Sequence, residues 1–168
     1  MVTLETERLR LRMFRETDFE PYARICADPE VMRYLADGKL LTGAEAWRQM
    51  AMILGHWQLR GYGLWAVEER ATGALLGRIG LFNPEGWPGL ELGWALGRKH
   101  WGKGYATEGA RRALRYAFDE LKPPHLISLI RPENAASIRV AERLGETLEG
   151  RMELFGHAVL IYGIDRPA

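Results

Sequence analysis

Apolar and polar residues alternate along residues 8–14, near the beginning of the chain. A period of two puts successive side chains on opposite faces, which predicts a half-buried strand. The apolar face holds Leu9, Leu11 and Met13, and the opposite face holds Arg8, Arg10 and Arg12. Other short apolar segments predict strands at residues 64–68, 75–81, 90–96, 125–130, 147–154 and 158–164. A turn at residues 70–73 joins the first two of these in a hairpin.

Longer segments carry apolar residues at every third or fourth position, which predicts helices. Residues 105–121 follow this spacing most closely, and two prolines end the segment. A Thr followed three residues later by Glu is typical of a helix start, and it occurs at Thr17 and at Thr42. The second of these helices ends near Gly61. Its apolar stripe consists of Trp47, Met50, Ala51, Leu54 and Trp57. The predicted helices span residues 17–26, 28–35, 42–61, 105–121 and 134–144.

The order of these elements predicts the fold class. Hairpins dominate the middle of the chain, and strand–helix–strand crossovers follow later. We therefore expect an α/β fold with a mixed, mostly antiparallel sheet of six to seven strands and helices on both faces. No repeat, low-complexity tract or linker interrupts the pattern, so we expect residues 1–168 to form a single domain.

Composition narrows the class of protein. Apolar residues make up 47% and charged residues 27% of the chain, which is typical of a globular protein with a core. The formal net charge of +1 gives no global attraction for nucleic acid. Cys26 is the single cysteine, no apolar leader begins the chain, and no run of about 18 apolar residues occurs. We therefore expect a cytoplasmic protein without a membrane span.

The segment between the strand at 90–96 and the helix at 105–121 is rich in glycine. Gly102 and Gly104 allow close approach of a ligand, and the helix that follows presents free N–H groups, which favour phosphates. A dinucleotide fingerprint would need glycine where Thr107 stands, and a P-loop from Gly97 would need Ser or Thr in place of Gly104. A coenzyme A pyrophosphate cradle needs backbone amides alone. An ordinary flexible loop remains a fourth interpretation.

Three motifs in sequence order resemble one family. Thr6-Glu-Arg-Leu-Arg-Leu-Arg12 is similar to its opening strand, and Glu91-Leu-Gly-Trp-Ala-Leu96 followed by Trp101-Gly-Lys-Gly-Tyr-Ala-Thr-Glu108 to its acetyl-CoA segment. Asn134-Ala-Ala-Ser-Ile-Arg-Val-Ala-Glu-Arg-Leu-Gly145 is similar to its late helix. Together they resemble the Gcn-related N-acetyltransferase (GNAT) superfamily, specifically its RimJ/RimL-like branch. Trp101 stands where the wider superfamily has Gln or Arg. A Trp at this position is common in the RimJ/RimL-like branch.

The resemblance implies how acetyl-CoA would bind. The strand at Trp94–Leu96 would splay from its neighbour near Ser128, and the pantetheine arm would enter the split. Arg111, Arg112 and Arg115, or Arg139 and Arg143, could meet the 3′-phosphate, although a solvated helix face is the simpler interpretation. The implied cofactor-binding residues are Trp94, Ala95, Leu96, Trp101, Gly102, Lys103, Gly104, Tyr105, Ala106, Thr107 and Asn134.

Acetyl transfer to an amine requires a base for the amine and a proton for the departing thiolate. The resemblance implies Glu91 as the base, with Glu108 as a second candidate, although a first helical turn favours Glu by the helix dipole alone. Ala141 stands where many family members have a tyrosine acid, so Ser137 is the candidate proton donor. Each of these residues also has a plain structural interpretation, as a paired strand residue or a local cap.

The resulting hypothesis is an N-acetyltransferase that moves an acetyl group from acetyl-CoA to a primary amine by direct attack in a ternary complex. The alternatives are an acetyl-CoA-binding sensor without turnover and a nucleotide-binding protein. Trp87, Trp94 and Tyr34 are candidates for the acceptor pocket. The four histidines are dispersed, so we expect no metal. An exposed edge strand in the terminal hairpin could support a homodimer.

Overall fold

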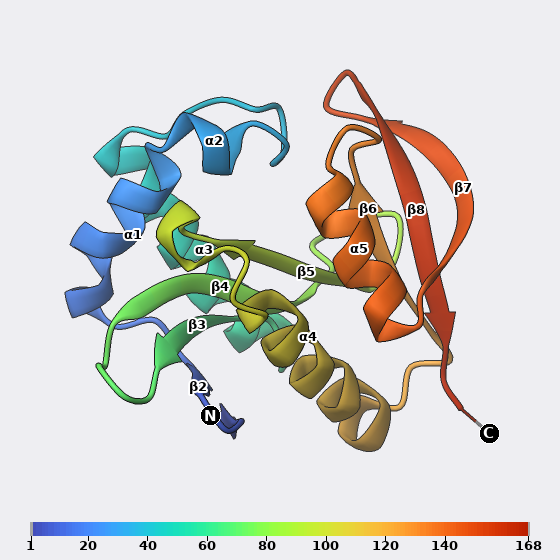
Figure 1. The fold of residues 1–168 in the computed structure, drawn as a ribbon, viewed down its shortest axis with the longest axis horizontal. Coiled ribbons are helices and arrows are strands. Elements are labelled where there is room, and N and C mark those ends of the chain that lie inside the picture. The colour runs from blue at the N-terminus through green and yellow to red at the C-terminus, as the bar shows by residue number, and fades with distance from the viewer. Residues whose placement is uncertain (1, 168) are drawn as a thin grey trace.

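A computed structural model describes residues 2–167 of the chain, which fold around one sheet (Figure 1). The strand order is β1-β2-β3-β4-β5-β6-β8-β7, and every neighbouring pair is antiparallel except β5 and β6. The described residues thus form eight strands, not six to seven, because a two-residue strand, β1, pairs with β2 at one edge. The strands are β1 Leu4–Glu5, β2 Leu9–Arg12, β3 Leu64–Glu69, β4 Leu75–Phe82, β5 Glu91–Leu96, β6 His125–Ile130, β7 Thr147–Leu154 and β8 His157–Asp165.

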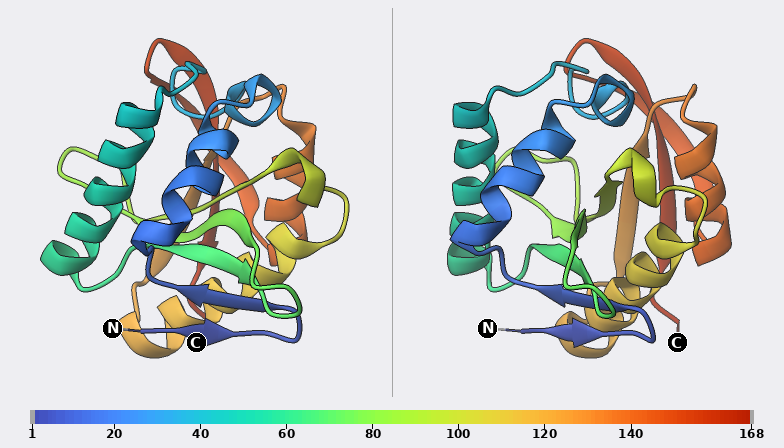
Figure 2. Two further views of the ribbon diagram at one scale, coloured as in Figure 1. Left: turned by 90° about the vertical axis from the view of Figure 1, so that its left-hand side faces the viewer. Right: turned by 60° about the vertical axis from the view of Figure 1, so that its left-hand side comes forward.

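Helices cover both faces of the sheet, as the sequence predicts (Figure 2). Helices α1 and α3 pack against each other on one face, where α1 contacts β4. Helix α4 packs on β4 and β5 across the opposite face, beside α5. The helices are α1 Phe19–Cys26, α2 Pro29–Met32, α3 Gly43–Arg60, α4 Tyr105–Tyr116 and α5 Ala135–Leu144, and a π-helical segment, Ala117–Leu121, extends α4.

Helix ends follow local sequence in most places. Thr42 caps α3 by accepting from the backbone N–H of Glu45, and Gly61 ends it with φ of 76°. The predicted start at Thr17 is wrong: Asp18 instead accepts from the backbone N–H of Arg15, and a 3-10 turn precedes α1. The stripe of α3 is also shifted, because its buried residues are Ala46, Met50, Ile53, His56 and Trp57.

The predicted polar face of the first strand is only partly exposed. Arg12 is 5% exposed, and its guanidinium donates to both carboxylate oxygens of Asp18 and to Glu68 at 2.7 to 2.9 Å. A buried guanidinium of this kind is tolerated because its positive charge faces carboxylates that also accept its hydrogen bonds. The alternation of residues 8–14 therefore predicts the strand correctly but not the burial of its third arginine.

Strands β5 and β6 separate soon after they meet. Their pairing is parallel and consists of the register Glu91 with Ile127 alone. The backbone N–H of Ile127 donates to the Leu90 carbonyl at 3.0 Å, and the Ser128 hydroxyl donates to the Leu92 carbonyl at 2.7 Å. Beyond these contacts, the side of β5 that faces β6 has no strand partner among residues 2–167. The expected splay near Ser128 is thus present.

The last hairpin places β7 at the edge of the sheet, beyond β8. Leu148 on this strand is 53% exposed. The possible homodimer through this edge stays a prediction. Within residues 2–167, none of the helices has the length and apolar character needed to cross a membrane.

Candidate active site

Two adjoining cavities lie where β5 and β6 separate. The turn cleft, of about 560 Å³, lies between the end of β5, the turn at residues 100–104 and the beginnings of α4 and α5. The central pocket, of about 320 Å³, lies between α3, β4, β5, β6 and the terminal hairpin. Tyr34, Leu35, Trp94, Asn134 and Ser137 line both, so the two cavities share a wall at the split in the sheet.

The turn before α4 leaves its backbone N–H groups free. Gly102 and Gly104 have φ of 72° and 80°, a left-handed conformation that glycine adopts without strain. Gly104 is the N-cap of α4, and since glycine has no side chain, no cap covers the first-turn N–H groups. These donors and the positive end of the helix dipole favour an anion at this end of the turn cleft.

Side chains around the turn are held by contacts to the protein itself. The Trp101 indole donates to the Leu96 carbonyl at 2.7 Å, and the Tyr105 hydroxyl donates to Glu69. The Lys103 carbonyl accepts from Arg8, and Lys103 does not line the turn cleft. The structure therefore gathers every predicted cofactor residue at this cleft except Lys103.

Glu108, the second candidate base, forms hydrogen bonds and an ion pair outside the two cavities. Its carboxylate accepts from the Thr6 hydroxyl at 2.6 Å and from the Arg8 backbone N–H at 3.0 Å, and it forms an ion pair with the Arg8 side chain. Partial burial would raise its pKa, but these hydrogen bonds hold the pKa of Glu108 below its usual value. Glu108 therefore joins the turn between β1 and β2 to α4 and is a poor proton acceptor.

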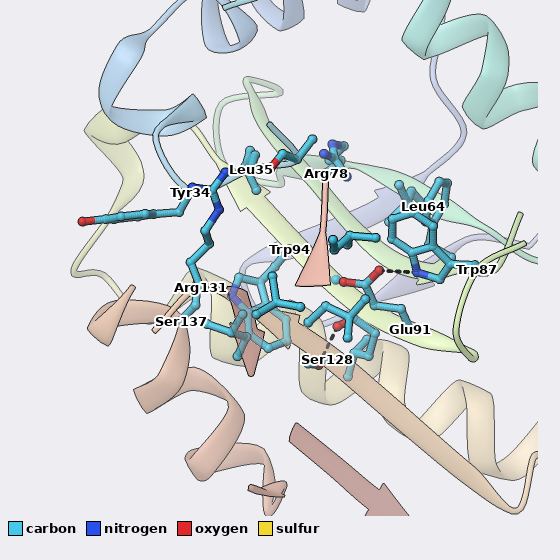
Figure 3. Close-up of a pocket in the computed structure, with 18 of the residues that line it drawn as sticks. Tyr34, Leu35, Leu64, Arg78, Trp87, Glu91, Trp94, Ser128, Arg131 and Ser137 are labelled. Atoms are coloured by element: carbon cyan, nitrogen blue, oxygen red, sulfur yellow. Dashed lines mark hydrogen bonds between the residues drawn. The ribbon is translucent and has the colours of Figure 1, made fainter. Parts of the chain in front are cut away.

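Glu91 lies in the opposite kind of surroundings, in the wall of the central pocket (Figure 3). Burial raises the pKa of Glu91 to about 7, although a hydrogen bond from Trp87 and the charge of Arg78 act in the other direction. The Trp87 indole donates to Glu91 Oε2 at 2.8 Å, which fixes the carboxyl and leaves Oε1 facing the pocket beside Gly93. A carboxyl with a pKa near 7 can both take and release a proton at neutral pH.

Ser137 and Asn134 meet at the wall between the cavities. The Trp94 indole donates to Ser137 Oγ at 3.1 Å, so the Ser137 hydroxyl hydrogen is free to donate. Asn134 Oδ1 caps α5 by accepting from the Ser137 backbone N–H at 3.2 Å. The amide NH₂ of Asn134 has no hydrogen-bond partner within residues 2–167. The Asn134 side chain therefore caps α5 with its oxygen and keeps its NH₂ group available as a donor.

A second buried acid, Glu146, lies behind the split. It is 3% exposed, its Oε1 is 3.1 Å from Ser128 Oγ, and its Oε2 has no partner within residues 2–167. The Ser128 hydroxyl has one hydrogen, which it donates to the Leu92 carbonyl at 2.7 Å. Its contact with Glu146 is therefore a full hydrogen bond when Glu146 is protonated and donates to the Ser128 oxygen. The pKa of Glu146 is raised to about 7, mainly by burial, and the nearby Glu91 contributes to this increase.

Sequence reasoning identified part of this site. Trp87, Trp94 and Tyr34 line the central pocket as expected, and Glu91 is one of its walls. Arg78 and Glu146 were missed. Arg78 could have been found, because it is the single charge in the apolar strand Leu75–Phe82. Glu146 gives no such signal, since it follows a helix-ending glycine on a polar stretch. No cluster of three metal-ligating side chains occurs in residues 2–167.

The cleft thus offers free amides, which favour phosphates, and the adjoining pocket offers a carboxyl of raised pKa. The chain matches the acetyltransferase (GNAT) domain family over residues 8–147 and belongs to that family. It is therefore an acetyl-CoA-dependent acyltransferase. The expected GNAT fold is confirmed.

The chain is also similar to individual proteins. The Bacillus subtilis protein YkkB, itself uncharacterised, is 34% identical over 95% of this chain and 93% of its own length. A crystal structure of an acetyltransferase from Agrobacterium tumefaciens has a TM-score of 0.86 at 33% identity, covering 98% of this chain and 94% of that one. RimL, a ribosomal L7/L12 alpha-N-protein acetyltransferase solved with coenzyme A, shares the fold at 19% identity, with a TM-score of 0.82 over 98% of each chain.

Proposed function

We propose that this protein acetylates a primary amine by direct attack of the amine on acetyl-CoA within a ternary complex. The observation that carries the proposal is Glu91, a carboxyl of raised pKa in a pocket that adjoins the cradle. An amine of pKa near ~10 is mostly protonated at neutral pH, so it must lose a proton before it can attack. Glu91 is placed to accept that proton.

The reaction balances with the residues at the split. The amine nitrogen forms a bond to the acetyl carbonyl carbon, and its protons pass to Glu91 and from there to water. The carbon–sulfur bond breaks, and Ser137 supplies a proton to the departing thiolate and recovers one from solvent. Cys26 is buried behind the pocket, with a pKa raised by burial, so we infer no covalent enzyme intermediate.

The described residues fit acetyl-CoA as the donor substrate. The free N–H groups after Gly104 would hold the pyrophosphate, and the Asn134 amide donors face the same cleft. The unpaired side of β5 offers backbone hydrogen bonds to an amide-bearing arm. RimL, which was solved with coenzyme A, has the same fold, which supports this placement.

The test compares Glu91→Gln with Glu142→Gln, an exposed acid on α5 that serves as the matched control. We expect Glu91→Gln to bind acetyl-CoA in calorimetry like wild type and to release coenzyme A about 10²–10³-fold more slowly with an amine acceptor. Glu142→Gln should match wild type in both. Acetyl-CoA binding without turnover by wild type, over a broad set of amines, would instead favour the sensor. Full activity of Glu91→Gln would remove Glu91 as the base.

A further inference from the structure

Arg78 is a charged side chain in an otherwise apolar strand, and it faces the central pocket (Figure 3). It is partly buried, and within residues 2–167 it forms no ion pair with a carboxylate. Arg12, by contrast, is a buried arginine with a structural role, and two acids neutralise its charge. A guanidinium keeps its charge at any physiological pH, so an unpaired one in a pocket favours an anionic ligand.

The groups beside Arg78 do not neutralise it. Tyr22 and Cys26 of α1 are close enough to feel its charge, but burial raises the pKa of both, so both are neutral near pH 7. Glu91 also feels this charge, burial favours its neutral form, and even its charged form would balance only one of two cations. A second cation, Arg131, lines the pocket and donates to the Ala36 carbonyl at 2.8 Å. The net charge of the pocket is therefore positive.

The strand register fixes how Arg78 and Glu91 are spaced. Arg78 pairs with Ala95, and Glu91 pairs with Phe82, so the two residues lie on one face, four residues apart along the strands. At roughly 3.3 Å per residue their Cα atoms are separated by about 13 Å along the sheet. Gly93 lies between them, and a Cβ there would meet Glu91 Oε1 at 3.8 Å and nothing closer. The space between the cation and the base is thus open on the side of β5.

We propose that the amine acceptor also carries a carboxylate, which pairs with Arg78 while the amine lies at Glu91. The inference rests on the proposed acetyl transfer and names its substrate class as a small amino carboxylate. Two cations near the amine favour its neutral, reactive form over the ammonium form, because like charges repel. The same repulsion disfavours polyamines and other multiply cationic acceptors. Aromatic and aliphatic walls, including Trp87 and Phe155, favour an apolar stem.

The test measures kcat/KM for three amino carboxylates and for matched amines without the carboxylate. The pairs are phenylalanine with its amide, 4-aminobutanoate with butylamine, and 6-aminohexanoate with hexylamine, and spermidine is the polycation. We expect at least one amino carboxylate to exceed its partner by about tenfold or more, and spermidine to react slowest. The pair with the largest ratio reports the distance between the amine and the carboxylate. Ratios near one for all pairs, or preference for spermidine, would overturn the inference.

Arg78→Met keeps the apolar stem and removes the charge, and Arg48→Met on the exposed surface of α3 is the control. We expect Arg78→Met to raise KM about 10–100-fold more for the preferred carboxylate than for its matched amine, whereas Arg78→Lys should retain part of the preference. A preference that persists in Arg78→Met would show that another group binds the carboxylate.

A binding measurement separates this inference from the proposed reaction. N-acetylphenylalanine and N-acetylphenylalaninamide are titrated by calorimetry into the protein loaded with coenzyme A. Tighter binding of the carboxylate, lost in Arg78→Met, supports the anion site even if no amine is acetylated. Equal binding of the two compounds overturns the anion site even if amines are acetylated well.

Discussion

The turn cleft and the central pocket adjoin each other but are built in different ways. The cleft offers backbone N–H groups that a glycine turn and a helix start leave unpaired. The pocket offers side chains from α3, β4, β5 and β6, whose chemistry depends on what surrounds them. A site built from backbone groups tolerates changes of side chain but not of backbone conformation. A site built from side chains is sensitive to the identity of each side chain.

Glu108 and Glu91 illustrate the same difference. Each is a candidate base, and the two pKa values move in opposite directions. Hydrogen bonds from Thr6 and Arg8 favour the charged form of Glu108. Glu91 accepts from the Trp87 indole and the Leu129 backbone in an apolar pocket, and these hydrogen bonds do not offset the loss of water. The number of donors around each carboxyl, rather than its position in the sequence, decides whether it can act as a base.

The largest expected effect comes from a change in the backbone conformation of the cleft. Gly104→Val replaces a residue at φ of 80°, which a β-branched side chain adopts only with strain, so the turn should shift and lose its amide donors. We expect acetyl-CoA to bind about 100-fold more weakly in calorimetry. Gly73→Val, at φ of 72° in the β3–β4 turn with nothing within 4 Å of the added Cβ, is the control. Equal losses in both variants would mean that instability, not the cradle, weakens binding.

The next effect concerns the protonation of Glu91. Because its pKa is about 7, the base form is present above that pH and declines tenfold per pH unit below it. We expect kcat at saturating acceptor to be about tenfold lower at pH 6 than at the plateau, and to become flat with pH in Glu91→Gln. Two acceptors of different amine pKa should share the inflection near pH 7. An inflection near pH 4.5, or one that follows the amine, would contradict the assignment.

The two regions also explain what the sequence could predict. The turn before α4 is a contiguous segment, and a required positive φ selects glycine. Gly102 and Gly104 could therefore be identified from the sequence. The fold was predictable for a similar reason, because caps such as Thr42 and stops such as Gly61 act within a few residues. Arg78 and Glu146 acquire their roles from neighbours distant in the chain, at Tyr22 and Ser128 respectively. The single charge in an apolar strand marks Arg78 in the sequence, but the tertiary contacts that give Arg78 and Glu146 their roles leave no local pattern.

Ser137 provides a smaller effect that tests the wall between the two cavities. Its hydroxyl accepts from Trp94 and is free to donate, but a thiol of pKa near ~8.5 is a good leaving group that needs little help. We therefore expect Ser137→Ala to lower kcat about three- to tenfold, without changing acetyl-CoA binding. Ser137→Thr, which keeps a hydroxyl, should recover most of the rate. An unchanged kcat in Ser137→Ala would mean that solvent, and not Ser137, protonates the departing thiolate.

The smallest expected effect concerns the stability contributed by Glu146. Its pKa is higher in the folded chain than in the unfolded one, so between about pH 4.5 and 7 the folded state binds more protons. The free energy of unfolding should therefore fall as pH rises through this window, and above pH 7 the buried charge is a full penalty. Glu146→Gln keeps the shape, can donate to Ser128 and cannot ionise. We expect it to be more stable than wild type at pH 8, by on the order of 1–2 kcal/mol, and equal to it near pH 5.

The same substitution should shift the activity profile, because the charge of Glu146 reaches Glu91. Once Glu146 cannot become an anion, Glu91 loses its proton more easily, so the inflection in kcat should move to lower pH by a fraction of a unit. Glu146→Ala, which also loses the contact to Ser128, should be less stable than wild type at pH 5, where Glu146 is neutral. A Gln variant less stable than wild type at pH 8 would mean that the fold favours the charged form of Glu146, and its unpaired Oε2 would then need a donor.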